Sequence, residues 1–209
     1  TTSNTSVDAN MLTMEIMKKV AEKHGLVCLL HEKPFEGING SGKHNNWSMS
    51  TDTGLNLLNP GKEPENNTLF KLALAAVIRA VDDYQGILRA SVASAGNDHR
   101  LGANEAPPAI ISVYLGDQLG AIVDCIVKGE NYVPVKAEKG SIGVPESPIF
   151  PKDATDRNRT SPFAFTGNKF EFRMPGSQAS VADPNIVLNT IVADAFAAFA
   201  DELEKAKDI

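Results

Sequence analysis

Lys169-Phe170-Glu171-Phe172-Arg173-Met174-Pro175 alternates strictly between charged and apolar side chains. Because successive side chains of a strand point to opposite faces, Phe170, Phe172 and Met174 share one face and the three charges share the other. The pattern predicts a strand whose apolar face lies in the core. Two interpretations of the charged face stay open: an ordinary solvated face, or the wall of a site for an anionic substrate or a metal–phosphate complex.

The overall composition is that of a globular protein without nucleic-acid or membrane features. The chain has 209 residues, a length that suits one large domain or two small ones, and no linker divides it. A net charge of -6 gives no basic surface for nucleic acid. The sequence contains no run of 18 apolar residues, so no membrane helix is predicted, and the first residues have no signal-peptide pattern. Cys28 and Cys125 lie in apolar surroundings and are expected to be free thiols in a reducing cytoplasm.

Two kinds of periodicity divide the chain into elements. Helical spacing of apolar residues predicts helices over residues 8–24, 68–84, 116–128 and from 183 onward, with a broken segment over 87–95. Apolar residues predict strands over residues 26–30 and 109–115, and alternation predicts strands over residues 47–53 and 169–175. Asp8 or Asn10 is expected to cap the first helix and Asp183-Pro184 to open the last. Residues 129–162 show no clear period. Without regular βαβ spacing, an α+β fold is favoured.

Residues 37–44, G-I-N-G-S-G-K-H, resemble a phosphate-binding P-loop but end in His44 where the motif has serine or threonine. The residues that follow are poor helix formers, although a P-loop needs a helix there. The glycines allow close approach of the backbone to a ligand, or simply form a flexible turn. His44 by itself is weak evidence for a site. If it lies beside Glu171, however, the imidazole and the carboxylate could bind Mg²⁺ or Mn²⁺.

Four segments together resemble glutamine synthetase, and specifically its long type III form. They are residues 33–48, 97–108, 157–162 and 169–175, in the order of the family. The resemblance implies that residues 1–209 form a partial catalytic domain, an antiparallel sheet with flanking helices that is truncated at both ends. The N-terminal β-grasp domain and the C-terminal continuation would be absent. The parent protein would be a homo-oligomer with active sites between subunits.

The implied reaction is the ATP-dependent ligation of glutamate and ammonia to glutamine through γ-glutamyl phosphate, with Mg²⁺ or Mn²⁺. By match to the family motifs, His44 and Glu171 would hold a metal ion, and Asn39, Gly40, Arg100 and Arg173 would bind glutamate or the acyl phosphate. Glu105 would accept the ammonium proton, and Arg159 would meet the nucleotide phosphates. Asn46, Ser48 and Lys169 would bind the nucleotide.

The chain also departs from the family pattern. Arg100 and Glu105 are one residue closer than in the common bacterial form, and Ala164 stands where that form has a second arginine. The paired metal-binding glutamates of the family would lie before Thr1, so the 209-residue piece alone is expected to be inactive. Two alternatives remain: a γ-glutamyl-amine ligase of the same fold, and a non-catalytic nucleotide-binding or assembly module.

Overall fold

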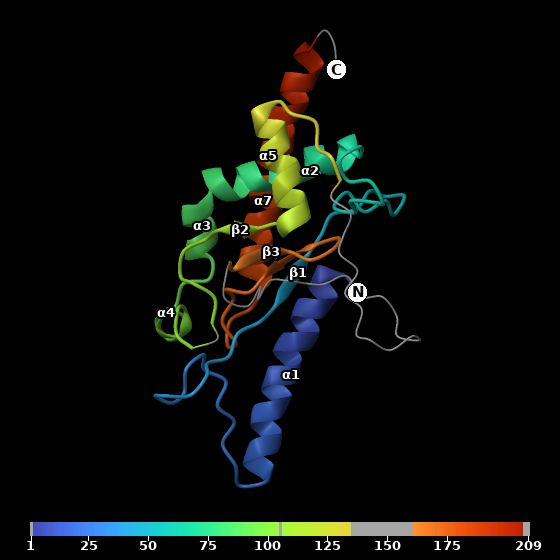
Figure 1. Cartoon of the computed structure of the whole chain (residues 1–209). Helices are drawn as coiled ribbons and strands as arrows, with labels where there is room; N and C mark the ends of the chain where they lie inside the picture. The colour runs from blue at the N-terminus through green and yellow to red at the C-terminus, as the bar shows by residue number, and fades with distance from the viewer. Residues whose placement is uncertain (1, 105, 135–160, 207–209) are drawn as a thin grey trace, which may run out of the picture.

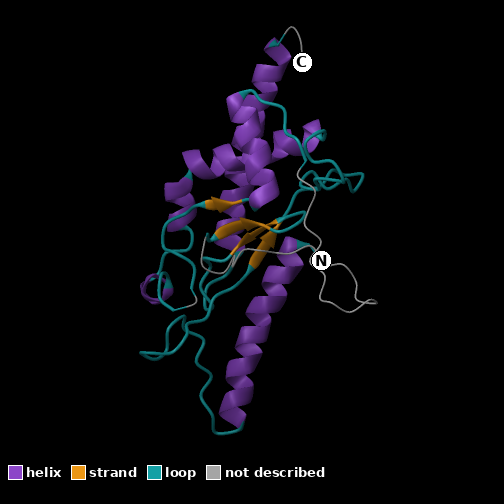
Figure 2. Ribbon diagram, in the orientation of Figure 1, coloured by secondary structure: helices purple, strands orange, loops and turns teal. Residues whose placement is uncertain are grey.

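A computed structural model describes residues 2–104, 106–134 and 161–206 as helices above and below a small central sheet (Figures 1 and 2). The helices are α1 (Ser3–Lys23), α2 (Thr68–Asp83), α3 (Gln85–Ala90), α4 (Ala95–Arg100), α5 (Asp117–Lys128) and α7 (Ala182–Lys205). The strands are β1 (Asn45–Trp47), β2 (Val113–Tyr114), β3 (Phe163–Phe165) and β4 (Phe170–Phe172). This mixture of helices with a small sheet is consistent with the predicted α+β class.

The four strands form one sheet in the order β1-β4-β3-β2. Strand β4 is antiparallel to β1 and to β3, as predicted, but β2 runs parallel to β3. The prediction of a purely antiparallel sheet is therefore wrong at this edge. The reason lies in the connection, because a parallel pair needs a long crossover and the chain from β2 to β3 includes helix α5.

One face of the sheet carries the aromatic core. Phe163 stacks on Phe170 with ring centroids 4.6 Å apart, and Phe165 lies edge-on to Phe170 at 5.3 Å. Helix α2 reaches this face through Phe70, whose ring centroid lies 5.9 Å from that of Phe165. Helix α7 covers β1, where the Trp47 indole N–H donates to the side chain of Asn189. The apolar alternation in 169–175 is thus explained, and the charged residues of β4 lie on the opposite face.

The strongest helix predictions are confirmed, with differences at the ends. Helices α2 and α5 match the predicted ranges 68–84 and 116–128. Helix α1 begins at Ser3, so the expected caps Asp8 and Asn10 are wrong, and α7 begins at Ala182, one residue before the expected Asp183. The broken segment predicted over 87–95 is confirmed in part by α3. Helix α4 lies almost entirely beyond it, where no helix was predicted.

The predicted strand over residues 26–30 does not form. Val27 is 84% exposed, and no described strand lies beside this segment to accept its backbone hydrogen bonds. The apolar stripe predicted for α1 is likewise uncovered, with Leu12 62% exposed and Met14 the buried residue of that helix. The strand predicted over 109–115 shortens to β2. The strand predicted over 47–53 is displaced, because β1 ends at Trp47, where that prediction begins. Within the described residues, no helix combines the length and apolarity needed to cross a bilayer.

Candidate functional site

His44 and Glu171 lie in direct contact although 127 residues separate them in the sequence. The Nδ1 atom of His44 is 2.7 Å from Oε1 of Glu171. The sheet register explains the contact, because His44 directly precedes β1 and Glu171 pairs with Asn46 across the β1–β4 ladder. The imidazole is 60% exposed and the carboxylate side chain 14% exposed, so the pair opens to solvent on the histidine side.

Arg173 follows β4 directly, two residues after Glu171, so an extended chain points the two side chains in the same direction. It is buried, and its Nη2 donates to the carbonyl of Ser161. Its backbone N–H donates to Pro162 at 2.8 Å, which continues the ladder between the β3 and β4 segments. The Arg173 side chain and backbone are therefore both bonded to the segment that leads into β3.

The glycine-rich segment 37–44 continues the sheet and does not precede a helix. Gly42 forms a bridge with Gly176, and the N–H of Lys43 donates to the carbonyl of Pro175 at 2.9 Å. Strand β1 follows directly. The P-loop interpretation is wrong, because no helix N-terminus stands where the phosphates would bind.

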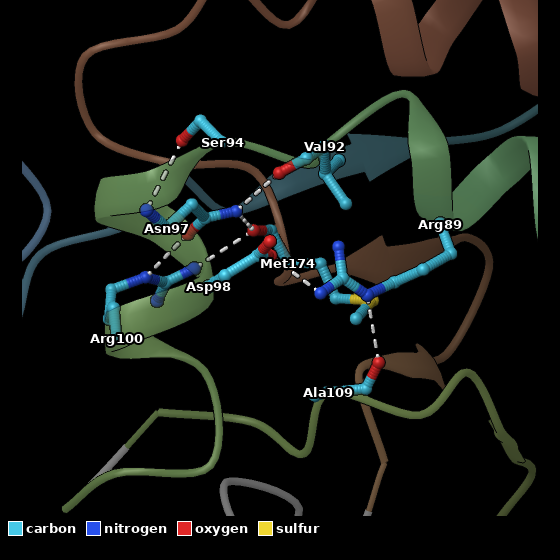
Figure 3. A network of polar contacts seen from close by, with 8 residues as sticks. All are labelled: Arg89, Val92, Ser94, Asn97, Asp98, Arg100, Ala109 and Met174. Carbon is cyan, nitrogen blue, oxygen red and sulfur yellow. Dashed lines mark hydrogen bonds and ion pairs between the residues drawn. The ribbon is translucent and has the colours of Figure 1, made fainter.

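Arg100 is buried at the end of α4, and its donors face protein acceptors (Figure 3). Its Nε donates to Oδ1 of Asn97 at 2.9 Å, and its Nη2 donates to the carbonyl of Met174 at 2.9 Å. Longer contacts of 3.4 Å reach the carbonyls of Arg173 and Pro175. The guanidinium thus anchors the chain that leaves β4, and its predicted contact with substrate stays a prediction.

Asn97 completes this network, and sequence reasoning passed over it. Its side chain is buried, and its amide nitrogen donates to the carbonyls of Val92 at 2.7 Å and Met174 at 2.9 Å. The carbonyl of Met174 therefore receives hydrogen bonds from both Asn97 and Arg100 (Figure 3). An ordinary polar loop carries no signal that distinguishes such a residue from a solvated one.

Two glycines make room for Arg100. A Cβ atom on Gly40 would lie 2.6 Å from its Cγ, and a Cβ atom on Gly42 would lie 2.7 Å from its Cζ. Both distances are below van der Waals contact. The glycines predicted to allow approach of a ligand therefore allow, in this structure, approach of an arginine side chain.

Glu32 is a second buried polar residue that sequence reasoning missed. Its carboxylate accepts the N–H of Gln178 at 3.1 Å, and its carbonyl accepts the N–H of Ser41 at 2.7 Å. Burial lowers the pKa of the Arg100 guanidinium and of the Lys43 ammonium, and the negative charge of Glu32 counteracts both shifts. No pattern in the sequence distinguishes Glu32 from Glu36, the exposed acidic residue of the same loop.

The other predicted site residues that the structure describes differ in exposure. Asn39, Asn46 and Ser48 are exposed, Gly40 is half-buried, and Lys169 is half-buried with its ammonium 3.3 Å from Oδ1 of Asn168. Glu105 and Arg159 lie outside the described residues. The side chain of Asn104, next to Glu105, donates to the carbonyl of Ile38 at 2.9 Å and ties that loop to the glycine segment.

The His44–Glu171 pair suits two adjacent positions of a divalent metal. Two ligands at right angles, each about 2.1 Å from Mg²⁺, lie about 3 Å apart, close to the observed 2.7 Å. Within the described part of the chain, no group of three or more histidine, cysteine or acidic side chains could hold an ion. Mg²⁺ commonly binds through one or two protein ligands, with water and substrate phosphates in the other positions. The donor set therefore fits a metal shared with a phosphorylated substrate.

Comparison with known proteins identifies the family. Residues 1–113 match the family described as glutamine synthetase, catalytic domain. The chain is 58% identical over 201 residues to the type-3 glutamine synthetase of Dictyostelium discoideum. The aligned region covers 96% of this chain and 27% of that protein. It is 62% identical over 184 residues to a glutamine synthetase of Butyrivibrio fibrisolvens, covering 87% of this chain and 26% of that protein. For a glutamine synthetase of Bacteroides fragilis (strain YCH46), the identity is 50% over 205 residues, 97% of this chain and 28% of that protein.

The chain thus spans about a quarter of the length of these curated relatives. The resemblance carried by its four motifs is confirmed by a family match that extends over more than half of its residues. The chain belongs to the glutamine synthetase family, in the part that forms the catalytic domain.

Proposed function

We propose that the longer protein carrying this chain ligates glutamate and ammonia to glutamine at the expense of ATP. The observation that supports it is the contact between His44 and Glu171, because the two predicted metal ligands meet on one face of the sheet. The relatives named glutamine synthetase support the same reaction.

His44 and Glu171 would hold one divalent ion, Mg²⁺ or Mn²⁺, which when bound neutralises charge on the transferred phosphoryl group. Arg173, on the same face as Glu171, is suited to bind a carboxylate or acyl phosphate through its planar guanidinium. We assign Arg100 to the same pocket, with Nη1 as the nitrogen that faces Gly42. Its other donors would keep the guanidinium in place.

The remaining assignments follow the family motifs. Asn39 and Gly40 line the glutamate side of the pocket, and Asn46, Ser48 and Lys169 the nucleotide side. Arg159 stabilises the nucleotide phosphates, and Glu105 accepts the proton that ammonium gives up before attack. We also propose a cytoplasmic homo-oligomer whose active sites lie between subunits.

The reaction predicts the fate of one oxygen atom. A γ-carboxylate oxygen of glutamate attacks the γ-phosphorus of ATP and ADP leaves; ammonia then attacks the acyl carbon, and phosphate leaves with that oxygen. Glutamate labelled with ¹⁸O in the γ-carboxylate should therefore yield one ¹⁸O per phosphate, measured by mass spectrometry on the full-length protein. Unlabelled phosphate would contradict the acyl-phosphate route, and turnover with a larger amine but not with ammonia would favour the amine ligase.

Variants connect this chemistry to the site. Glu171→Gln keeps the shape of the side chain and removes its charge, and we expect it to lower glutamine formation by at least about 100-fold, since it removes a metal ligand. Glu36→Gln, at an exposed position of the preceding loop, is the matched control and should remain near wild type. Equal activity of the two variants would contradict the assignment of Glu171.

A further inference from the structure

The carboxylate of Glu32 lies where three separate segments of the site meet. Its backbone carbonyl holds Ser41 of the glycine segment, and its Oε1 accepts the N–H of Gln178, beyond the end of β4. Its side chain is 3% exposed. The β1–β4 ladder and the Gly42–Gly176 bridge already join the segments that carry His44 and Glu171. Glu32 adds a further link between them through one buried acidic residue.

Glycines surround this carboxylate as closely as they surround Arg100. A Cβ atom on Gly96, in the first turn of α4, would lie 2.6 Å from Oε2 of Glu32. A Cβ atom on Gly176, the bridge partner of Gly42, would lie 2.9 Å from its Cδ. The backbones of α4 and of the β4 exit thus approach the carboxylate with no side chain between them.

Charge gives a reason for an acid at this position. The buried guanidinium of Arg100 is stabilised by the negative charge of Glu32. An uncharged residue at position 32 would leave this desolvated cation without that compensation, which is costly in a low-dielectric surrounding.

We propose that Glu32 is a positioning residue for the metal-ligand pair: by joining the glycine segment to the β4 exit, it helps to fix the β1–β4 register in which His44 and Glu171 meet. The inference rests on the proposed role of that pair in metal binding. Glu32 acts through the backbone of the two segments that it joins. Neither the family motifs nor the alternation of β4 points to it.

The test is pulsed EPR of Mn²⁺ bound to the 209-residue chain. An imidazole nitrogen bound to Mn²⁺ gives a ¹⁴N modulation of the spin echo, which reports His44 in the ligand set. We expect wild type to show this modulation, and Glu32→Gln to lose most of it while binding Mn²⁺ about 10-fold more weakly, at the lower end of outer-shell effects. Glu36→Gln should match wild type in both measurements.

The outcomes separate the two proposals. If wild type itself shows no ¹⁴N modulation, the metal pair is wrong, and the role of Glu32 falls with it. A second outcome has three parts: wild type shows the modulation, Glu171→Gln weakens Mn²⁺ binding, and Glu32→Gln behaves like wild type. In that case the metal pair stands, and the inference about Glu32 is overturned. Should Glu32→Gln fail to fold, as judged by thermal unfolding, Glu32→Asp takes its place. It retains the charge but withdraws the carboxylate by one methylene, and a modulation equal to that of wild type would overturn the proposal.

Discussion

Replacing Asn97 with alanine tests the network that holds the end of β4. The wild-type amide makes three hydrogen bonds: to the carbonyls of Val92 and Met174, and from Nε of Arg100. In the variant, the Met174 carbonyl would keep its hydrogen bond from Nη2 of Arg100. The Val92 carbonyl and Nε of Arg100 would each lose the partner that Asn97 provides. At about 1–3 kcal/mol for each buried group that is left unsatisfied, the variant should lose about 4 kcal/mol, within roughly 2–6 kcal/mol.

Urea denaturation of the 209-residue chain gives the free energy of unfolding. Trp47 is the single tryptophan, is buried and is bonded to Asn189, so its fluorescence reports the β1–α7 contact away from the mutation. Asn66→Ala, at an exposed position whose side chain bonds to Glu63, is the control and should change stability by less than about 0.5 kcal/mol. A loss in Asn97→Ala no larger than that of the control would refute the importance of the network.

Three further predictions concern other parts of the molecule. Phe170→Ala removes a fully buried ring that stacks on Phe163, and urea denaturation should show a loss of about 4 kcal/mol, whereas a loss under 2 kcal/mol would contradict the aromatic core. Gly42→Ala should lower the free energy of unfolding by about 1–3 kcal/mol, because its Cβ would overlap Arg100. Gly120→Ala, with open space around it in α5, should raise the free energy of unfolding by up to about 1 kcal/mol. A change of the same sign in both variants would be evidence against close packing at Gly42. The hydrogen bond from Tyr84 to Asp194 raises the pKa of the tyrosine above its usual value of 10.0, so its stabilising effect is complete below pH 10 and is lost as the pH rises through the raised pKa. Tyrosinate absorbance should titrate one tyrosine at lower pH in Asp194→Ala, and unchanged curves would count against the contact.

The sequence was most informative where both local pattern and packing favour the same element. Helix α2 has Asn67 as a cap that accepts the N–H of Phe70, and its apolar stripe packs on the sheet, so helical spacing predicted it well. Residues 26–30 have a strand pattern but no described strand beside them, and Leu12 on α1 has a helical pattern but no described cover. Periodicity identifies an apolar face, yet the partner of that face is a property of the tertiary structure.

For the site, the alternation in β4 predicted which residues share a face, but it did not predict the register. The contact of His44 with Glu171 depends on the alignment of β1 with β4, and a slip by one residue would turn one of them to the core. Glu32 and Asn97 could not be found because their importance comes from burial among backbone groups of distant segments. The parallel pairing of β2 also depends on a crossover that no local pattern reveals.

The central claim is that His44 and Glu171 hold a divalent metal ion together. It is tested most directly by titrating Mn²⁺ into the 209-residue chain and following the free ion by EPR, in wild type, His44→Ala and Glu171→Gln. His31→Ala, at an exposed position of the same polar loop, is the control. We expect weak binding in wild type and in the control, and binding at least about 10-fold weaker in both site variants, because each removes one of the two ligands. Equal Mn²⁺ affinity in wild type and in either site variant would contradict the claim.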